Sequence, residues 1–240
     1  MKKIFSVLAA LMLVFAFAAC GEDEPTVTVS DTDSPQPQTT AQTTTTAAAP
    51  TTTTQAVDTE TVPQSDTIPE VFAPILSNRQ QFVCNDNDNT MMYFDEIDFL
   101  GTPLTPVDYT VIDMDANGSF DLIVRFKSDD GEQFYYSIFM ASGDTVCMTT
   151  RTYRAFFDLR ADGIFGFSAS AAHSGYATMT LENGIITHVE KAALEGNAEG
   201  TITCRIDGQA ATQADFDAFA AAHLAKEEPT WHTFSASDFM

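Results

Sequence analysis

Beyond Pro106 the chain alternates between short runs of β-branched and aromatic residues and pairs of turn-forming residues. Such runs, separated by Asp-Gly, Asn-Gly or Gly-Asp pairs, are typical of strands joined in hairpins. The pairs lie at Asp130-Gly131, Gly143-Asp144, Asp162-Gly163, Asn183-Gly184 and Asp207-Gly208. The strands predicted around them are Tyr109–Ile112, Asp121–Phe126, Gln133–Met140, Thr145–Thr150, Ala155–Leu159, Ile164–Ser168, Tyr176–Leu181, Ile185–Glu190 and Thr201–Ile206.

Two other segments have apolar residues at the spacing of one helical face. Pro69–Cys84 begins with a proline that suits a first helical turn, and Gln213–Leu224 follows Thr212, a good N-terminal cap.

Because consecutive hairpins pair antiparallel, we predict an α+β, mainly antiparallel β fold. It is expected to be a meander of about nine strands, with an N-terminal and a C-terminal helix packed on the sheet. Whether the sheet is open or closed into a barrel stays undecided.

The N-terminus is typical of an exported protein. Lys2 and Lys3 precede an uncharged apolar run, Ile4–Ala19, which is short for a membrane span. The end of this run with the next two residues, Phe17-Ala18-Ala19-Cys20-Gly21, resembles the lipobox of bacterial lipoproteins, with Phe17 in place of the usual Leu. That resemblance implies a signal peptide over residues 1–20 and lipidation of Cys20, which would hold the protein on the outer face of the cell membrane. The alternative is a plain secretory signal.

Residues 21–67 have the composition of a disordered tether. They contain no aromatic residue, no Leu and no Ile, and are dominated by Thr with Pro, Gln and Ala. Such a segment cannot bury enough apolar surface to offset its ordering entropy. It is either a stalk, which can carry O-glycans, or a plain spacer. We therefore expect one globular domain, residues 68–240, after the tether.

The charge of the chain restricts its partners. There are 34 acidic residues against 11 Lys and Arg in 240 residues, a formal net charge of -23. Because such a surface repels phosphate, nucleic-acid binding through basic patches is excluded.

One motif carries recognisable chemistry. Between the first two predicted strands the chain reads D-x-D-x-N-G-x-x-D, with oxygen-bearing side chains at alternate positions and Gly at the sharp turn. This pattern is what a calcium loop requires, and calcium is the predicted cofactor, with a dissociation constant of about 0.1–1 mM. An EF-hand is excluded because Val124 stands where its bidentate Glu would be. The alternative is an acidic turn without an ion. The predicted ligands are Asp113, Asp115, Asn117, Asp121 and the carbonyl of Ser119.

The motif resembles the calcium loops of FG-GAP and VCBS repeats, in which an Asp-rich turn joins two antiparallel strands. It is also similar to a segment of a group of uncharacterised lipoproteins of anaerobic Gram-positive bacteria. Further likenesses to that group are Arg205-Ile206-Asp207-Gly208, Asp215-Phe216-Asp217-Ala218-Phe219 and Trp231-His232-Thr233-Phe234. Ala116, where such segments often have Gly, is a departure. The resemblance implies no activity.

Other reactive residues lack a pattern that specifies chemistry. His173, His188, His223 and His232 have no zinc-site spacing, and Ser168, His173 and Ser174 are interpreted as a loop rather than a hydrolase site. Asp86 and Asp88 are interpreted as a solvated loop rather than a second cation site. Beyond Cys20 the chain has three cysteines, so at most one internal disulfide can form, and all three can equally be buried thiols. They are Cys84, Cys147 and Cys204.

These observations favour a calcium-stabilised, non-catalytic binding or envelope module of unknown ligand on the cell surface. The alternative is an enzyme that degrades an extracellular polymer with a pair of carboxylates from Asp95, Glu96 and Asp98. A two-lobed solute receptor is disfavoured because it normally needs a longer chain.

Overall fold

The computed structural model describes residues 64–128 and 133–239. The chain divides into two units, residues 1–55 and 56–240, and all the described residues belong to the second. The predicted signal peptide, Cys20, nearly all of the predicted tether and the pair Asp130-Gly131 lie outside the described residues. Gln64 already bridges to Ile112, so contacts with the domain begin slightly before residue 68.

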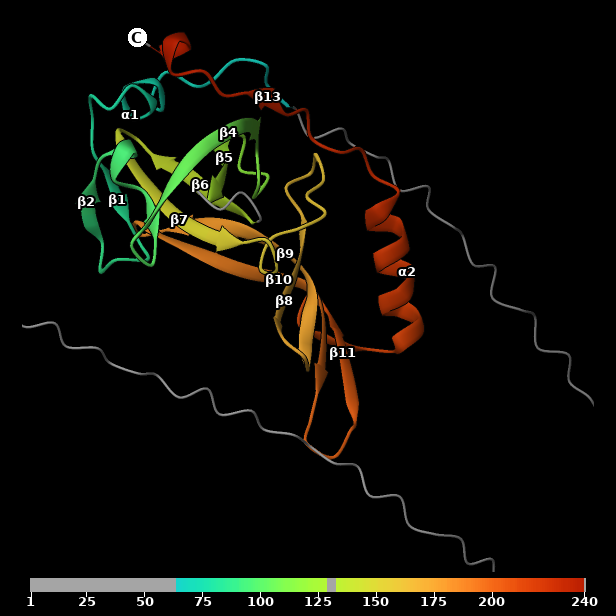
Figure 1. The fold of residues 1–240 in the computed structure, drawn as a ribbon. Helices are drawn as coiled ribbons and strands as arrows, with labels where there is room; N and C mark the ends of the chain where they lie inside the picture. The colour runs from blue at the N-terminus through green and yellow to red at the C-terminus, as the bar shows by residue number, and fades with distance from the viewer. Residues whose placement is uncertain (1–63, 129–132, 240) are drawn as a thin grey trace, which may run out of the picture. The chain divides into compact units, whose positions relative to one another are not determined.

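The described residues form thirteen strands in two sheets, and all strand pairs but one are antiparallel (Figure 1). The larger sheet has the order β13-β4-β5-β6-β7-β1-β2, with β3 paired to β4. Its strands are β1 Phe82–Cys84, β2 Thr90–Met92, β3 Asp98–Phe99, β4 Thr102–Ile112, β5 Asp121–Ser128, β6 Phe134–Ser142, β7 Thr145–Thr152 and β13 His232–Thr233.

The second sheet has the order β12-β11-β10-β9-β8. Its strands are β8 Phe165–Ser170, β9 His173–Glu182, β10 Ile185–Gly196, β11 Ile202–Ile206 and β12 Gln209–Ala211. The helices are α1 Ala73–Leu76 and α2 Gln213–Leu224, with short 3-10 turns η1 Phe94–Glu96 and η2 Ala236–Phe239. Helix α2 begins where predicted, because the Thr212 hydroxyl accepts a hydrogen bond from the Asp215 N–H.

Three apolar clusters hold these layers together. One face of the larger sheet packs its Val124, Phe126 and Phe139 against α1 and η1. The other face meets the second sheet in a shared core that includes Ile123 and Phe165. Helix α2 covers the remaining face of the second sheet, where Phe216 packs near Tyr176. The larger sheet is therefore buried on both faces, which explains the nearly continuous apolar sequence of β5.

The prediction of a mainly antiparallel β fold is confirmed, and that of a single nine-strand meander is wrong. The hairpins at Gly143-Asp144, Asn183-Gly184 and Asp207-Gly208 form as predicted.

Ala155–Leu159, predicted as a strand, is a turn segment with one bridge from Phe157 to Gly166. Asp158 has a left-handed backbone, φ 48°, which interrupts extended structure. At this interruption the chain leaves the larger sheet and starts the second.

The predicted N-terminal helix over Pro69–Cys84 is also wrong in length. Only Ala73–Leu76 is α-helical, because Asn78 adopts a left-handed backbone, φ 58°, just after it. Phe82–Cys84 then extends as β1 and pairs in parallel with β7. The apolar spacing of this segment fits both a helical face and an alternating strand, and contact with β7 decides between them.

Candidate metal centre

The acidic motif forms the connection between β4 and β5, and its first carboxylate organises the turn. Asp113 is 4% exposed and accepts hydrogen bonds from the Asn117 N–H, at 3.0 Å, and the Gly118 N–H, at 2.8 Å. A buried carboxylate that accepts backbone N–H groups satisfies the donors that a tight loop leaves unpaired. Ala116 takes a left-handed conformation, φ 58°, which Gly adopts more readily than a residue with a Cβ atom.

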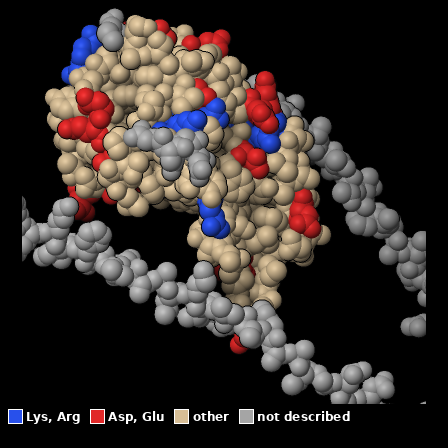
Figure 2. Space-filling model, viewed as in Figure 1, with Lys and Arg blue, Asp and Glu red and all other residues tan. Residues whose placement is uncertain are grey.

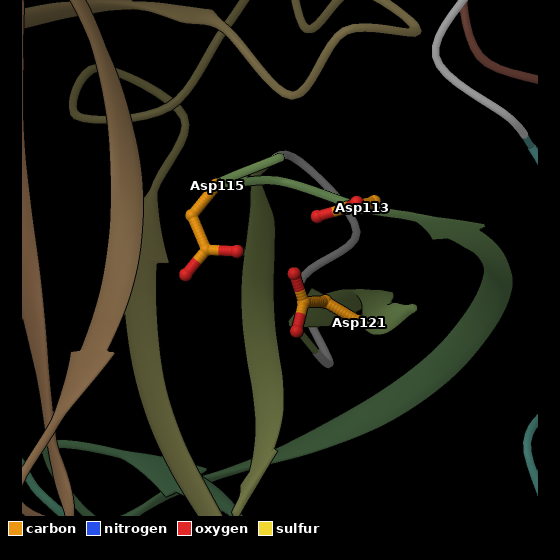
Figure 3. Close-up of side chains that lie close together, drawn as sticks. All are labelled: Asp113, Asp115 and Asp121. Atoms are coloured by element: carbon orange, nitrogen blue, oxygen red, sulfur yellow. The ribbon is translucent and has the colours of Figure 1, made fainter. Parts of the chain in front are cut away.

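Three carboxylates converge inside this loop (Figure 3). Asp113, Asp115 and Asp121 each present an oxygen, and these oxygens lie within 4.8 Å of one another. Asp121 is 2% exposed and accepts a hydrogen bond from the Met114 N–H at 2.9 Å. The Oδ1 atom of Asp115 is buried and has no hydrogen-bond partner among the residues that the structure describes. Buried polar atoms normally have partners, so this oxygen is available to a cation. The cluster can hold a metal ion.

Electrostatics also favour a cation here. Burial, and then the neighbouring charges of Asp115 and Asp113, raise the pKa of Asp121 to about 8, against the lowering effect of the Met114 N–H. Burial and the charge of Asp113 likewise raise the pKa of Asp115. Three ionised carboxylates this close repel one another, and a divalent ion would replace that repulsion with attraction.

The two other predicted ligands are Asn117 and the carbonyl of Ser119. The Asn117 side-chain oxygen accepts the Ser119 N–H at 2.7 Å, and both residues are exposed. In this arrangement Asn117 stabilises the turn.

Two residues far along the chain support the loop. The Thr178 hydroxyl, on β9, hydrogen-bonds the Met114 carbonyl and lies 3.3 Å from the Gly163 carbonyl. Gly163 has φ 77°, and a Cβ atom there would lie 2.4 Å from Met114 Cα. The loop is therefore held against the second sheet. From the sequence, the Asp162-Gly163 pair predicts only a hairpin turn. It gives no indication that Gly163 packs against the acidic loop.

Two of the other candidate residues, Asp86 and His173, have structural partners. Asp86 accepts a hydrogen bond from the Thr149 hydroxyl at 2.7 Å and one from the Thr150 N–H, and its carboxylate lies 3.7 Å from the Arg151 guanidinium. His173 pairs with Glu190 at 2.9 Å. In the part of the chain that the structure describes, the only group of three or more potential metal-ligating His, Cys, Asp or Glu residues is the aspartate cluster.

The three cysteines of the domain are free and buried, as one of the two sequence interpretations held: Cys84, Cys147 and Cys204. Among the described residues no helix has the length and apolar character needed to cross a bilayer.

Comparisons of the chain with protein-family models, with curated proteins and with solved structures found no match.

Proposed function

We propose that the protein is a cell-surface lipoprotein whose domain is stabilised by a calcium ion bound between β4 and β5, and that it acts as a non-catalytic binding or envelope module. The observation that carries the calcium assignment is the Asp115 carboxylate, which has one buried oxygen without a hydrogen-bond partner among the described residues and lies close to the two buried carboxylates. The anchor rests on the sequence around Cys20, which resembles a lipobox.

Calcium suits the cluster better than magnesium does. Two oxygens at the 4.8 Å limit of the cluster can both contact an ion midway between them at 2.4 Å, and calcium binds oxygen at about 2.3–2.6 Å, so three oxygens at that limit would need only a small inward movement. Magnesium requires about 2.0–2.1 Å and near-ideal octahedral geometry, which would draw the carboxylates closer together. The motif lacks a bidentate Glu, so the affinity falls in the weak range of extracellular calcium modules.

Calorimetry tests the metal. Calcium added to the full chain should give a one-site isotherm that disappears in Asp115→Ala, whereas Asp144→Ala, an exposed acid in the β6–β7 turn, should bind as the wild type does. At a free calcium concentration ten times Kd, the midpoint of thermal unfolding should rise by the equivalent of about 1.4 kcal/mol. Absence of binding heat together with an unchanged melting temperature in chelator would refute the assignment.

The anchor has a separate test. Cells that express the protein are grown with a fatty-acid probe, and the wild type should incorporate label that Cys20→Ala lacks. Equal labelling of the two proteins, or none in either, contradicts the anchor and leaves the metal assignment standing.

The polymer-degrading alternative gains no support from its candidate carboxylates. Asp95 and Asp98 line two different cavities, and both are exposed. Glu96 accepts the Tyr93 N–H at 2.7 Å, so its carboxylate caps the η1 turn.

A further inference from the structure

A cavity of about 180 Å³ lies where the segment after β7 meets β5, β6 and the segment before β13. Its walls combine aromatic rings with guanidinium groups, contributed by Arg125, Tyr136, Phe156, Arg160, Glu228 and Trp231. On the face drawn in Figure 2, basic side chains gather near the middle, between acidic groups on either side. The cavity shares no lining residue with the aspartate cluster, so neither site depends on the other for its groups.

Arg160 is the unusual member of this set. It is 7% exposed, and both of its hydrogen bonds are made by Nη1, to the Glu228 carboxylate at 3.1 Å and to the Lys226 carbonyl at 3.5 Å. Its Nε is buried without a hydrogen-bond partner. A guanidinium offers Nε and Nη2 as a planar fork, and no described residue places an acceptor on this edge of Arg160. A buried N–H without an acceptor is unfavourable, so the edge favours an incoming acceptor.

Arg125, in the same wall, illustrates what such an edge binds. Its Nε donates to the Asp108 carboxylate at 2.8 Å and its Nη2 to the other oxygen of that carboxylate. The guanidinium of Arg125 lies 4.9 Å from the centre of the Trp231 ring and thus keeps the indole in place. The cavity therefore contains two guanidinium groups: Arg125 has a carboxylate on its Nε edge, whereas the one carboxylate on Arg160, that of Glu228, is bound at Nη1.

We propose that this cavity binds a small monocarboxylate, with the carboxylate on the Nε edge of Arg160 and a ring-sized body against Tyr136 and Trp231. The volume is below the range of about 300–1,000 Å³ that drug-sized ligands occupy, which restricts the ligand to about one ring. The acidic surface disfavours ligands of higher negative charge. This inference names a ligand class for a module whose ligand the proposed function leaves open.

Glu228 sets the strength of binding. Its side chain is 79% exposed, yet it holds one nitrogen of the Arg160 guanidinium and places a negative charge beside the incoming carboxylate. Removing that charge should strengthen binding, which is the opposite of what loss of a merely structural ion pair would do.

Ligand binding in this cavity can be measured by tryptophan fluorescence. Trp231 is the only Trp of the chain, so its fluorescence reports directly on this cavity. The full chain is titrated with cyclohexanecarboxylate and with D-glucuronate, and the neutral cyclohexanecarboxamide and D-glucose serve as controls. Saturable fluorescence changes with either acid, at least about tenfold weaker with its neutral partner, are expected. Equal responses to acid and neutral partner, or none with both acids, would overturn the proposal.

Variants separate the site from fold effects. Arg160→Lys keeps the charge but loses the fork and should weaken acid binding about tenfold, whereas Arg205→Lys, an exposed arginine, should leave it unchanged. Glu228→Gln should tighten acid binding about threefold. Unchanged affinity in both Arg160→Lys and Glu228→Gln, each with a wild-type melting temperature, would rule the site out. If Arg160→Lys does not fold, the Glu228→Gln result alone decides. Chelator should not affect acid binding, so failure here leaves the calcium assignment intact.

Discussion

Two connections between antiparallel strands in this domain reverse the direction of the chain in different ways. The β9–β10 turn reverses the chain at Asn183 and Gly184, both with left-handed backbones, and a Cβ atom at Gly184 would meet nothing within 4 Å. The β4–β5 loop spans residues 113–120 and buries carboxylates in place of exposing them.

The two connections differ in the contacts that each needs from other parts of the fold. The tight turn is complete once its two residues adopt the required dihedral angles. The acidic loop needs backbone N–H donors, a close approach by Gly163 and a hydroxyl from Thr178. It also retains an unpartnered oxygen on Asp115. A connection that buries charge thus depends on the rest of the fold and, under our proposal, on an ion.

The largest expected effect is a pH dependence confined to the acidic loop. The pKa of Asp121 is about 8 in the folded state and 3.8 in its reference state, so the unfolded chain releases this proton first as pH rises. Stability in chelator should therefore fall between pH 4 and pH 8 by several kcal/mol, and level off above pH 8. Thermal unfolding of wild type and Asp121→Asn across this range measures the difference. Calcium should flatten the wild-type curve; identical slopes for both proteins in chelator would contradict the assignment.

The next effect compares two glycines. Gly163→Ala places a Cβ 2.4 Å from Met114 Cα on a left-handed backbone, and should cost about 3 kcal/mol or more. Gly184→Ala has the backbone strain without the clash, so about 1 kcal/mol is expected. Urea unfolding of both variants gives the comparison. Equal losses would mean that the contact between Gly163 and the acidic loop adds no strain.

Removing the organising carboxylate should cost somewhat less. Asp113→Ala leaves the N–H groups of Asn117 and Gly118 without their acceptor, and about 2 kcal/mol should be lost even in chelator. In the tight turn, Asn183→Ala should cost less than about 1 kcal/mol, since only the preference of Asn for φ 52° is lost. The same denaturant series measures both. A loss for Asp113→Ala that appears only with calcium present would make this residue a ligand without a structural role.

The smallest effect concerns two threonines on β9. Thr178→Val removes the hydroxyl that bonds the Met114 carbonyl and should cost about 1 kcal/mol. Thr180→Val is a matched control, because the Thr180 hydroxyl oxygen is buried without a partner and its loss should be neutral or stabilising. Differential scanning calorimetry resolves such differences. Comparable losses in the two variants would mean that Thr178 does not support the loop.

The hairpins could be predicted because the responsible signals are local. Asn183-Gly184 and Asp207-Gly208 favour their turns through backbone preferences alone, and the flanking strands alternate as a half-buried sheet requires. Helix α2 could be predicted for the same reason, since Thr212 caps it and its apolar residues recur at helical spacing.

The elements that prediction missed depend on distant partners. Phe82–Cys84 is a strand because β7 supplies the pairing, and the turn at Asp162-Gly163 is followed, in the described part of the chain, by only one antiparallel bridge, Phe157 to Gly166, while Gly163 packs on Met114. Neither partner is near in sequence, so no window of neighbouring residues contains the deciding contact. The cavity around Arg160 was also missed, since its lining residues come from four separate segments.

The order of charges in the acidic motif was sufficient to place three oxygens at one turn, because alternate side chains near a sharp bend face the same side. The tertiary structure decided the rest. Burial in the folded domain raises the pKa of Asp121, and the Asn117 side-chain oxygen accepts a hydrogen bond from the backbone of the loop. The division of the strands between two sheets is also tertiary, because a chain with apolar residues on both faces of β5 needs a second layer to cover them.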